Sequence, residues 1–150
     1  MTNENAIVDA KAELQKAQAA LRAARALAEL ELFDDAASRL YYAAFHLVSA
    51  ALLVLGVQAQ THAGVATLLG QHLVKPGLLP ASVSHDLSAL LGLRGQADYN
   101  RHFVLDSAGI AEELARVTRM FAVVEPFLRF AASSSRSLCA RDARDCREPP

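Results

Sequence analysis

LYYAAFHLVSAALLVLGV, residues 40–57, is the most apolar stretch of the chain, and it decides the fold. Its large side chains recur at helical spacing in two neighbouring stripes, one of Tyr41, Phe45, Val48, Leu52 and Leu55, the other of Leu40, Ala44, Leu47, Ala51 and Val54. A helix with apolar stripes this broad has no ordinary solvent face, so we expect it to be buried on more than one side. Two stripes suffice to pack a bundle. The remaining surface predicts a pocket or a partner subunit, which favours a homodimer.

The rest of the chain is also helical in pattern, without strand alternation, internal repeats or a Gly-rich phosphate loop. We therefore predict an all-α domain over residues 1–130 and a disordered polar tail over residues 131–150. Pro126 is expected to kink or shorten the last helix. Start and stop residues such as the N-cap Thr61 and the terminator Gly56 divide the domain into five helices, at about 5–31, 34–56, 62–74, 81–99 and 107–130.

The charge and cysteine content narrow the possible environments and partners. With 15 Lys and Arg against 16 Asp and Glu, the net charge is −1, so RNA would have to bind at a local basic patch. The first residues lack the pattern of a secretory signal, and the apolar stretch is interrupted by polar side chains, so we expect a cytoplasmic protein without a membrane span.

Cys139 and Cys146 match no metal site, and His62, His72 and His85 lack ligand spacing. These three histidines are interpreted as surface or capping residues, and we expect no metal or other cofactor.

A thin polar line follows the apolar helix: Arg39, Tyr42, His46 and Ser49. These residues fit two interpretations. In one, Arg39 forms a buried ion pair, with Asp98 as its partner, and His46 is a hydrogen-bonded core residue, so that Arg39→Ala would destabilise the fold by roughly 3–5 kcal/mol. In the other, the line is the wall of a ligand pocket. Asp98 also lies four residues after Arg94, which suits an ion pair within one helix.

Three motifs resemble the HEPN-domain family. Residues 37–46, ASRLYYAAFH, are similar to the SRxYYAxFH signature, residues 61–65, THAGV, to the sHxGV element, and residues 93–99, LRGQADY, to LRxxADY. They occur in the family's order and spacing. The resemblance implies an up-and-down bundle of four or five helices that pairs as a homodimer. It also implies a toxin-like protein whose partner is a minimal nucleotidyltransferase acting as antitoxin.

The usual HEPN ribonuclease motif is an Arg followed, after four to six residues, by a His, and this chain departs from it. Arg94 is followed by Tyr99 where many members carry the His, and His102 comes only after seven intervening residues. If the helix continued to His102, the two groups would lie roughly 12 Å apart along its axis. Only a break near Asn100 would fold His102 back toward Arg94.

Three functions remain open from the sequence. The first is a dimer that binds RNA or nucleotide at a pocket of Arg94, Arg39, Tyr42, His46, Asp98, Tyr99 and Arg101, and that works with the nucleotidyltransferase. The second is an active metal-independent endoribonuclease with Arg94 and His102 as catalytic residues. The third is a non-catalytic protein-interaction module. The resemblance further implies that the transferase silences its partner by attaching nucleotide to a tyrosine, here Tyr99.

Overall fold

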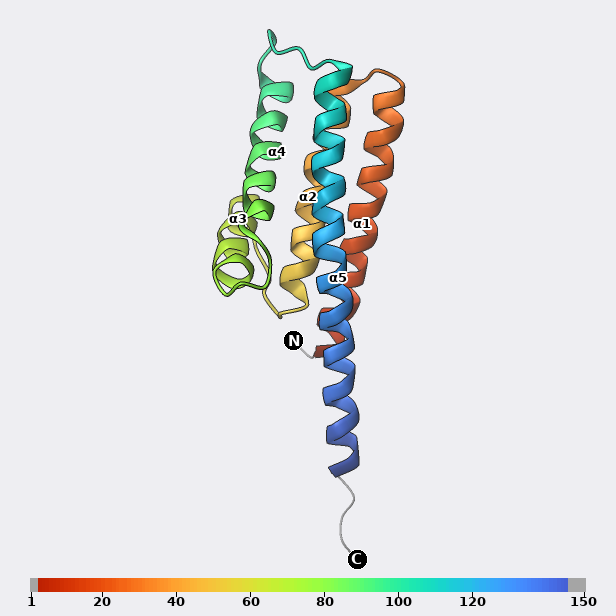
Figure 1. Ribbon diagram of the computed structural model, residues 1–150, viewed down its shortest axis with the longest axis vertical. Helices are drawn as coiled ribbons and strands as arrows, with labels where there is room; N and C mark the ends of the chain where they lie inside the picture. The colour runs from red at the N-terminus through yellow and green to blue at the C-terminus, as the bar shows by residue number, and fades with distance from the viewer. Residues whose placement is uncertain (1–2, 146–150) are drawn as a thin grey trace, which may run out of the picture.

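Four long helices lie side by side along the molecule, with one short helix beside them (Figure 1). The computed structural model describes the backbone of residues 3–145 and the side chains of residues 4–134. Over this part of the chain there is no strand, which confirms the all-α class. The elements are α1 (Asn3–Glu29), α2 (Phe33–Leu53), α3 (His62–Leu69) with its π-helical extension (Gly70–Val74), α4 (Ala81–Tyr99) and α5 (Ser107–Asp145).

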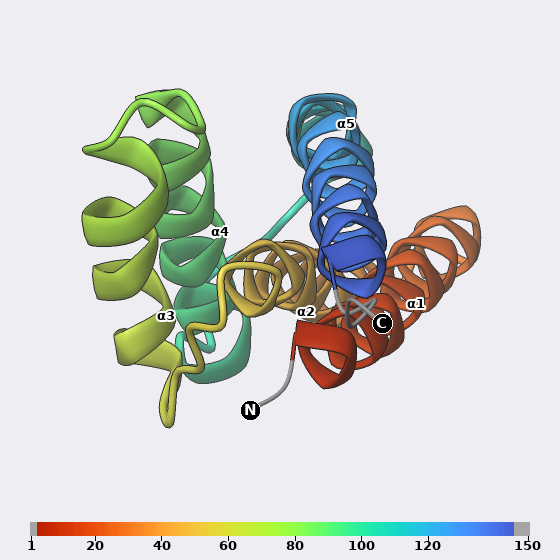
Figure 2. The same cartoon turned by 90° about the horizontal axis from the view of Figure 1, so that it is seen from below.

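Helix α2 is the centre of the bundle. Seen end-on, α2 has α1 on one side and α3 and α4 on the other, and α5 packs above it (Figure 2). Both predicted stripes are largely buried: Leu40, Leu47 and Val48 have no exposed surface. Small residues such as Ala17 and Ala24 of α1, also fully buried, allow α1 to pack closely. The expectation of burial on several sides is confirmed.

The same packing removes one argument for a homodimer. The apolar surface that was assigned to a partner subunit is covered by α1, α3, α4 and α5 of the same chain. Sequence periodicity shows how much of a helix is apolar, but not how many helices of its own chain surround it. The homodimer therefore stays a prediction that rests on the family resemblance.

The predicted helix boundaries hold at most ends. Thr61 caps α3, since its hydroxyl accepts a hydrogen bond from the Gly64 amide at 3.0 Å. Gly56 closes the turn after α2 with a φ of 74°, a conformation that glycine adopts without strain. Between residues 3 and 145, no helix combines the length and apolar character that crossing a bilayer requires.

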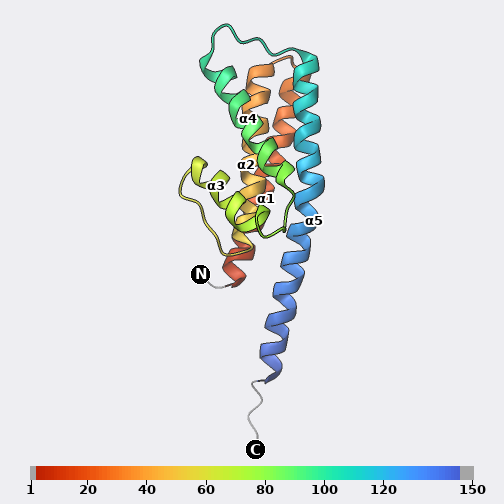
Figure 3. The same cartoon turned by 60° about the vertical axis from the view of Figure 1, so that its left-hand side comes forward.

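Helix α5 is the exception, because it continues past Phe130 to Asp145 and projects beyond the other helices (Figure 3). Pro126 lies inside it and does not end it. A proline removes one backbone hydrogen bond, and here Val124 and Leu128 on either side of it are buried in the core and hold the helix in place. The domain boundary at residue 130 stays a prediction. The side chains of Cys139 and Cys146 lie outside the described residues.

An ion cluster joins α4 to α5. Arg116 of α5 donates to Asp86 of α4 at 2.8 Å and to Glu113, one turn away on α5, at 2.9 Å. Partial burial lowers the pKa of Arg116, but the two carboxylates outweigh that effect and raise the pKa above its usual value. This guanidinium is therefore held between two negative charges.

Candidate functional site around Tyr42

Tyr42, half-buried on α2, is flanked by two arginines. The guanidinium carbons of Arg39 and Arg94 each lie 4.9 Å from its ring centroid, and Arg94 also lies 5.3 Å from the ring centroid of Tyr41. The face of an aromatic ring attracts cations, so Tyr42 gathers two positive charges that come from different helices. The structure thus brings together Arg39, Tyr42 and Arg94 as the sequence predicted.

Asp98 fixes Arg94 in this position. Its carboxylate accepts from Arg94 Nε at 3.2 Å, the predicted pair within one helix, and from the hydroxyl of Ser38 on α2 at 3.0 Å. Ser38 was not singled out in the sequence, although it is the Ser of the SRxYYAxFH motif. The hydrogen bond from Ser38 to Asp98 joins α2 to α4. It fixes the position of Asp98, and with it Arg94, along the length of α2.

The prediction of a buried ion pair between Arg39 and Asp98 is wrong. Arg39 is exposed, and its contact is the Tyr42 ring, while both oxygens of Asp98 are engaged by Arg94 and Ser38. Among the ion pairs of the described residues, Arg39 has none. Its guanidinium donors are therefore available to a ligand.

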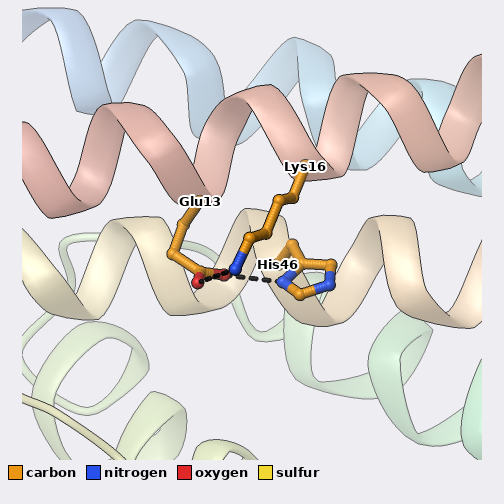
Figure 4. Close-up of polar contacts among 3 residues, drawn as sticks. All are labelled: Glu13, Lys16 and His46. Carbon is orange, nitrogen blue, oxygen red and sulfur yellow. Dashed lines mark hydrogen bonds and ion pairs between the residues drawn. The ribbon is translucent and has the colours of Figure 1, made fainter.

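His46 lies one turn further along α2, and its ring centroid is 6.4 Å from that of Tyr42. Its Nδ1 is 2.6 Å from a carboxylate oxygen of Glu13 on α1, and Lys16 approaches the same carboxylate at 3.5 Å (Figure 4). The side chains of His46 and Glu13 retain about a fifth of their exposure, 22% and 21%. Glu13 was missed because no motif of the chain marks it.

His62, the first residue of α3, completes the cluster. Its Nδ1 is 2.8 Å from the hydroxyl of Tyr41, and its ring stacks on Phe45 with centroids 4.3 Å apart. His62 is exposed at the start of α3, which fits its interpretation as a surface residue, but it also contacts Tyr41 and Phe45. The sHxGV resemblance was the signal that could have pointed to these contacts. Burial raises the pKa of the Tyr41 hydroxyl above 10.0; Arg94 lowers it and Tyr42 raises it further, so the hydroxyl is neutral at physiological pH.

The remaining predicted residues lie apart from Tyr42. Helix α4 ends at Tyr99, and Asn100 is extended, which is the break that the sequence required near this point. Yet Tyr99 is 85% exposed, and Arg101 and His102 are exposed in the segment that follows. The backbone amide of His102 donates to the Asn100 side chain, and no hydrogen bond among the described residues joins His102 to Arg94. A joint role of His102 and Arg94 therefore stays a prediction.

The Tyr42 cluster consists of Arg39, Tyr42, Arg94 and Asp98 with His46 and His62, and it is partly open to solvent. An apolar groove of about 350 Å³ lies elsewhere, between α1 and α5, where Leu14 and Leu128 are among its lining residues. No described group of three or more His, Cys, Asp and Glu side chains is arranged to hold a metal. The cluster can offer anion-binding guanidiniums, imidazole nitrogens and aromatic faces.

Comparison with known proteins identifies the family. The HEPN domain matches residues 10–131, which include all of α2, α3 and α4 and most of α1. The chain belongs to the HEPN-domain family, and the resemblance found in its motifs is confirmed.

Individual relatives include two UPF0332 proteins and one protein named as a putative toxin. A UPF0332 protein of Gloeobacter violaceus is 36% identical over 118 residues, which cover 77% of this chain and 92% of that protein. A protein of Methanocaldococcus jannaschii named "Putative toxin MJ0605" is 32% identical over 99 residues, covering 66% of this chain and 74% of its own. A UPF0332 protein of Thermotoga maritima is 24% identical over 114 residues, which cover 76% of this chain and 86% of that protein.

Proposed function

We propose that this HEPN-domain protein is the toxin-like component of a two-gene pair and that it binds RNA or nucleotide through the Tyr42 cluster. The observation that carries the proposal is the placement of Arg39 and Arg94 on one aromatic ring, with a carboxylate on Arg94 only. The planar guanidinium donates two parallel hydrogen bonds to a phosphate, which an ammonium group cannot do.

The charge of the chain supports a local site rather than a general affinity for nucleic acid. With a net charge of −1, the protein has no overall field to attract a polyanion. Binding then depends on the few guanidiniums that are free to contact phosphates, and the planar face of a guanidinium can also stack on an unpaired base. Single-stranded RNA fits such a surface better than a duplex.

The binding experiment uses a fluorescent single-stranded RNA and fluorescence anisotropy, with a nucleotide as competitor. We expect Arg94→Ala to weaken the complex at least tenfold, because it removes a phosphate contact and the anchor of the cluster. Arg119→Ala removes an exposed arginine of α5 away from Tyr42 and is the matched control. Equal losses in the two variants would mean that binding is non-specific, and the proposal would fail.

A minimal nucleotidyltransferase partner is part of the proposal, as is action in the cytoplasm. Relatives named as toxins support it, because a toxin requires a partner that restrains it in its own host. Tyr99 is the proposed acceptor of the nucleotide: it is 85% exposed at the end of α4, within reach of a second protein. The Tyr99 ring is not packed in the core, which supports this role.

Mass spectrometry of the protein, co-expressed with the transferase encoded beside it, tests this part. We expect a mass increase equal to one or more adenylates, located on Tyr99 and absent from Tyr99→Phe. Tyr42→Phe is the control, because Tyr42 is half-buried between two arginines. An active transferase that leaves Tyr99 unmodified would contradict the role assigned to this residue.

The homodimer is tested separately by sedimentation. We expect twice the chain mass of 16.1 kDa at micromolar concentration. A monomer at every concentration would remove the dimer from the proposal without affecting the Tyr42 cluster, whose contacts all lie within one chain.

A further inference from the structure

A groove outside the Tyr42 cluster lies at the end of the bundle where α1 turns into α2 and the chain crosses from α4 to α5. Both connections are seen at this end of the molecule (Figures 1 and 3). The groove has a volume of about 350 Å³, and its lining includes Glu31, Leu32, Asp34, Asp35, Phe103 and Val104. Leu32 is 47% exposed and Val104 is 85% exposed. Apolar side chains are thus presented to solvent beside three carboxylates.

The carboxylates of this groove have no counter-charge within it. No Lys or Arg is among the lining residues, and none of the ion pairs of the described residues involves Glu31, Asp34 or Asp35. Arg101 and His102 belong to the same α4–α5 connection but do not line the groove. The groove is therefore negatively charged as well as partly apolar.

The fold accounts for two of the carboxylates but not for the third. Asp34 and Asp35 lie in the first turn of α2, where a negative charge favours the helix. Glu31 follows the end of α1, where a negative charge is unfavourable, and its φ of 60° is one that glycine or asparagine adopts more easily. No hydrogen bond or ion pair described for its side chain offsets these two costs. A partner with a positive charge at this position would offset them.

We propose that this groove is the docking surface for the nucleotidyltransferase partner, and that the partner fills it with an apolar side chain flanked by Lys or Arg. The inference rests on the proposed function, since the partner is the transferase of the two-gene pair. It places the recruitment of that partner on the α1–α2 turn and the α4–α5 connection, apart from the arginines of the Tyr42 cluster.

Charge argues against the other occupants of the groove. RNA is a polyanion and is repelled by three unpaired carboxylates. A second copy of this chain, bound with two-fold symmetry through this groove, would bring the same carboxylates of both copies together. Like charges that face one another across an interface are costly, so a different protein of opposite charge fits better.

The position of Tyr99 links the groove to the proposed modification. Helix α4 ends at Tyr99, and Val104, five residues further along the chain, lines the groove. Five residues of extended chain span at most about 18 Å. An ordinary interface covers about 800 Å² on each partner, roughly 30 Å across. A transferase that is held at the groove can therefore reach the Tyr99 hydroxyl.

The test uses the full chain and the purified transferase that is encoded beside it, with a fluorescent label on the transferase. Glu31→Gly/Val104→Ser removes one carboxylate and one exposed apolar side chain of the groove. Glycine suits the conformation of residue 31, so this variant should fold with an unchanged or higher melting temperature. Asp9→Asn/Val8→Ser is the matched control, because it makes the same two kinds of change at exposed residues near the start of α1, at the other end of the bundle (Figure 1).

We expect the groove variant to bind the transferase at least about tenfold more weakly, and the control variant to bind it within about twofold of the native affinity. With limiting transferase and ATP, adenylation of Tyr99 should slow by the same factor in the groove variant. At saturating transferase it should return to the native rate, because the acceptor tyrosine is intact. RNA affinity should stay within about twofold of the native value, since the Tyr42 cluster is unchanged.

Three results would overturn the inference. If the groove variant binds the transferase with native affinity and is modified at the native rate, the transferase docks elsewhere, while the proposed function survives. If the groove variant loses RNA affinity or changes from dimer to monomer in sedimentation, RNA or a second copy is the occupant. If the native chain neither binds the transferase nor is modified by it, the transferase partnership itself fails, and the inference fails with it.

Discussion

Helix α4 takes part in two contacts between arginine and carboxylate that differ in the charges around the arginine. Near its start, Asp86 receives Arg116 from α5, and Glu113 binds the same guanidinium. Near its end, Arg94 is bonded to Asp98 and lies over Tyr41 and Tyr42 of α2. The first arginine has two carboxylates and the second has one, with a further arginine beside it.

The difference in charge separates a structural contact from a candidate binding site. Arg116, Asp86 and Glu113 together carry a charge of −1 and can attract no anion. Arg94, Arg39 and Asp98 together carry +1, and Arg39 is exposed. An ion pair that joins two helices is thus not evidence of function, whereas an excess of guanidinium beside aromatic rings is.

The largest expected effect follows from removing both arginines of the Tyr42 cluster. In Arg39→Ala/Arg94→Ala, RNA affinity should fall about 100-fold at moderate salt, because two phosphate contacts are lost. The dependence of log affinity on log salt should become shallower by about two units, one for each contact. An unchanged salt dependence would place the phosphate contacts elsewhere.

The opposite pattern is expected at the other contact. Arg116→Ala should lower the free energy of unfolding by about 1–3 kcal/mol, because Asp86 and Glu113 are left half-buried without their cation. RNA affinity should stay within twofold of the native value. Urea denaturation and anisotropy on the same sample give both numbers, and a loss of binding without a loss of stability would reverse the comparison.

The carboxylates should differ as well. Asp98→Asn frees Arg94 from its counter-charge, and we expect RNA affinity to rise about threefold. Asp86→Asn should leave affinity unchanged, since its arginine is not at the site. If Asp98→Asn weakens binding instead, the carboxylate is needed to position Arg94 more than it competes with phosphate.

The smallest effect is expected for the stability of Arg39→Ala. Because Arg39 is exposed and makes no ion pair among the described residues, the free energy of unfolding should change by less than about 1 kcal/mol. Thermal melting measures this. A loss of 3 kcal/mol or more would revive the buried ion pair that the sequence suggested.

Contacts within one helix were predictable, and contacts between helices were not. Arg94 and Asp98 pair because four residues along a helix bring side chains together, whatever else surrounds them. The cap at Thr61 and the burial of α2 follow from equally local patterns.

By contrast, Glu13 meets His46 across a separation of 33 residues, which depends on the register of α1 against α2. His62 reaches Tyr41 and Phe45 only after the chain reverses through Gly56. The assignment of Asp98 to Arg39 failed for the same reason: helical spacing says which residues share a face, but not which neighbouring arginine a carboxylate meets. The sequence motifs therefore indicated where the site lies, but the packing of the helices determines which side chains meet there.

The central claim is that Arg94 belongs to a binding site and Arg116 to the scaffold. The most direct test measures RNA affinity and unfolding free energy for Arg94→Ala and Arg116→Ala in one buffer. We predict that Arg94→Ala loses at least tenfold in affinity with little change in stability, and that Arg116→Ala loses stability with no change in affinity. Loss of both properties in both variants, or loss of affinity in neither, would contradict the claim.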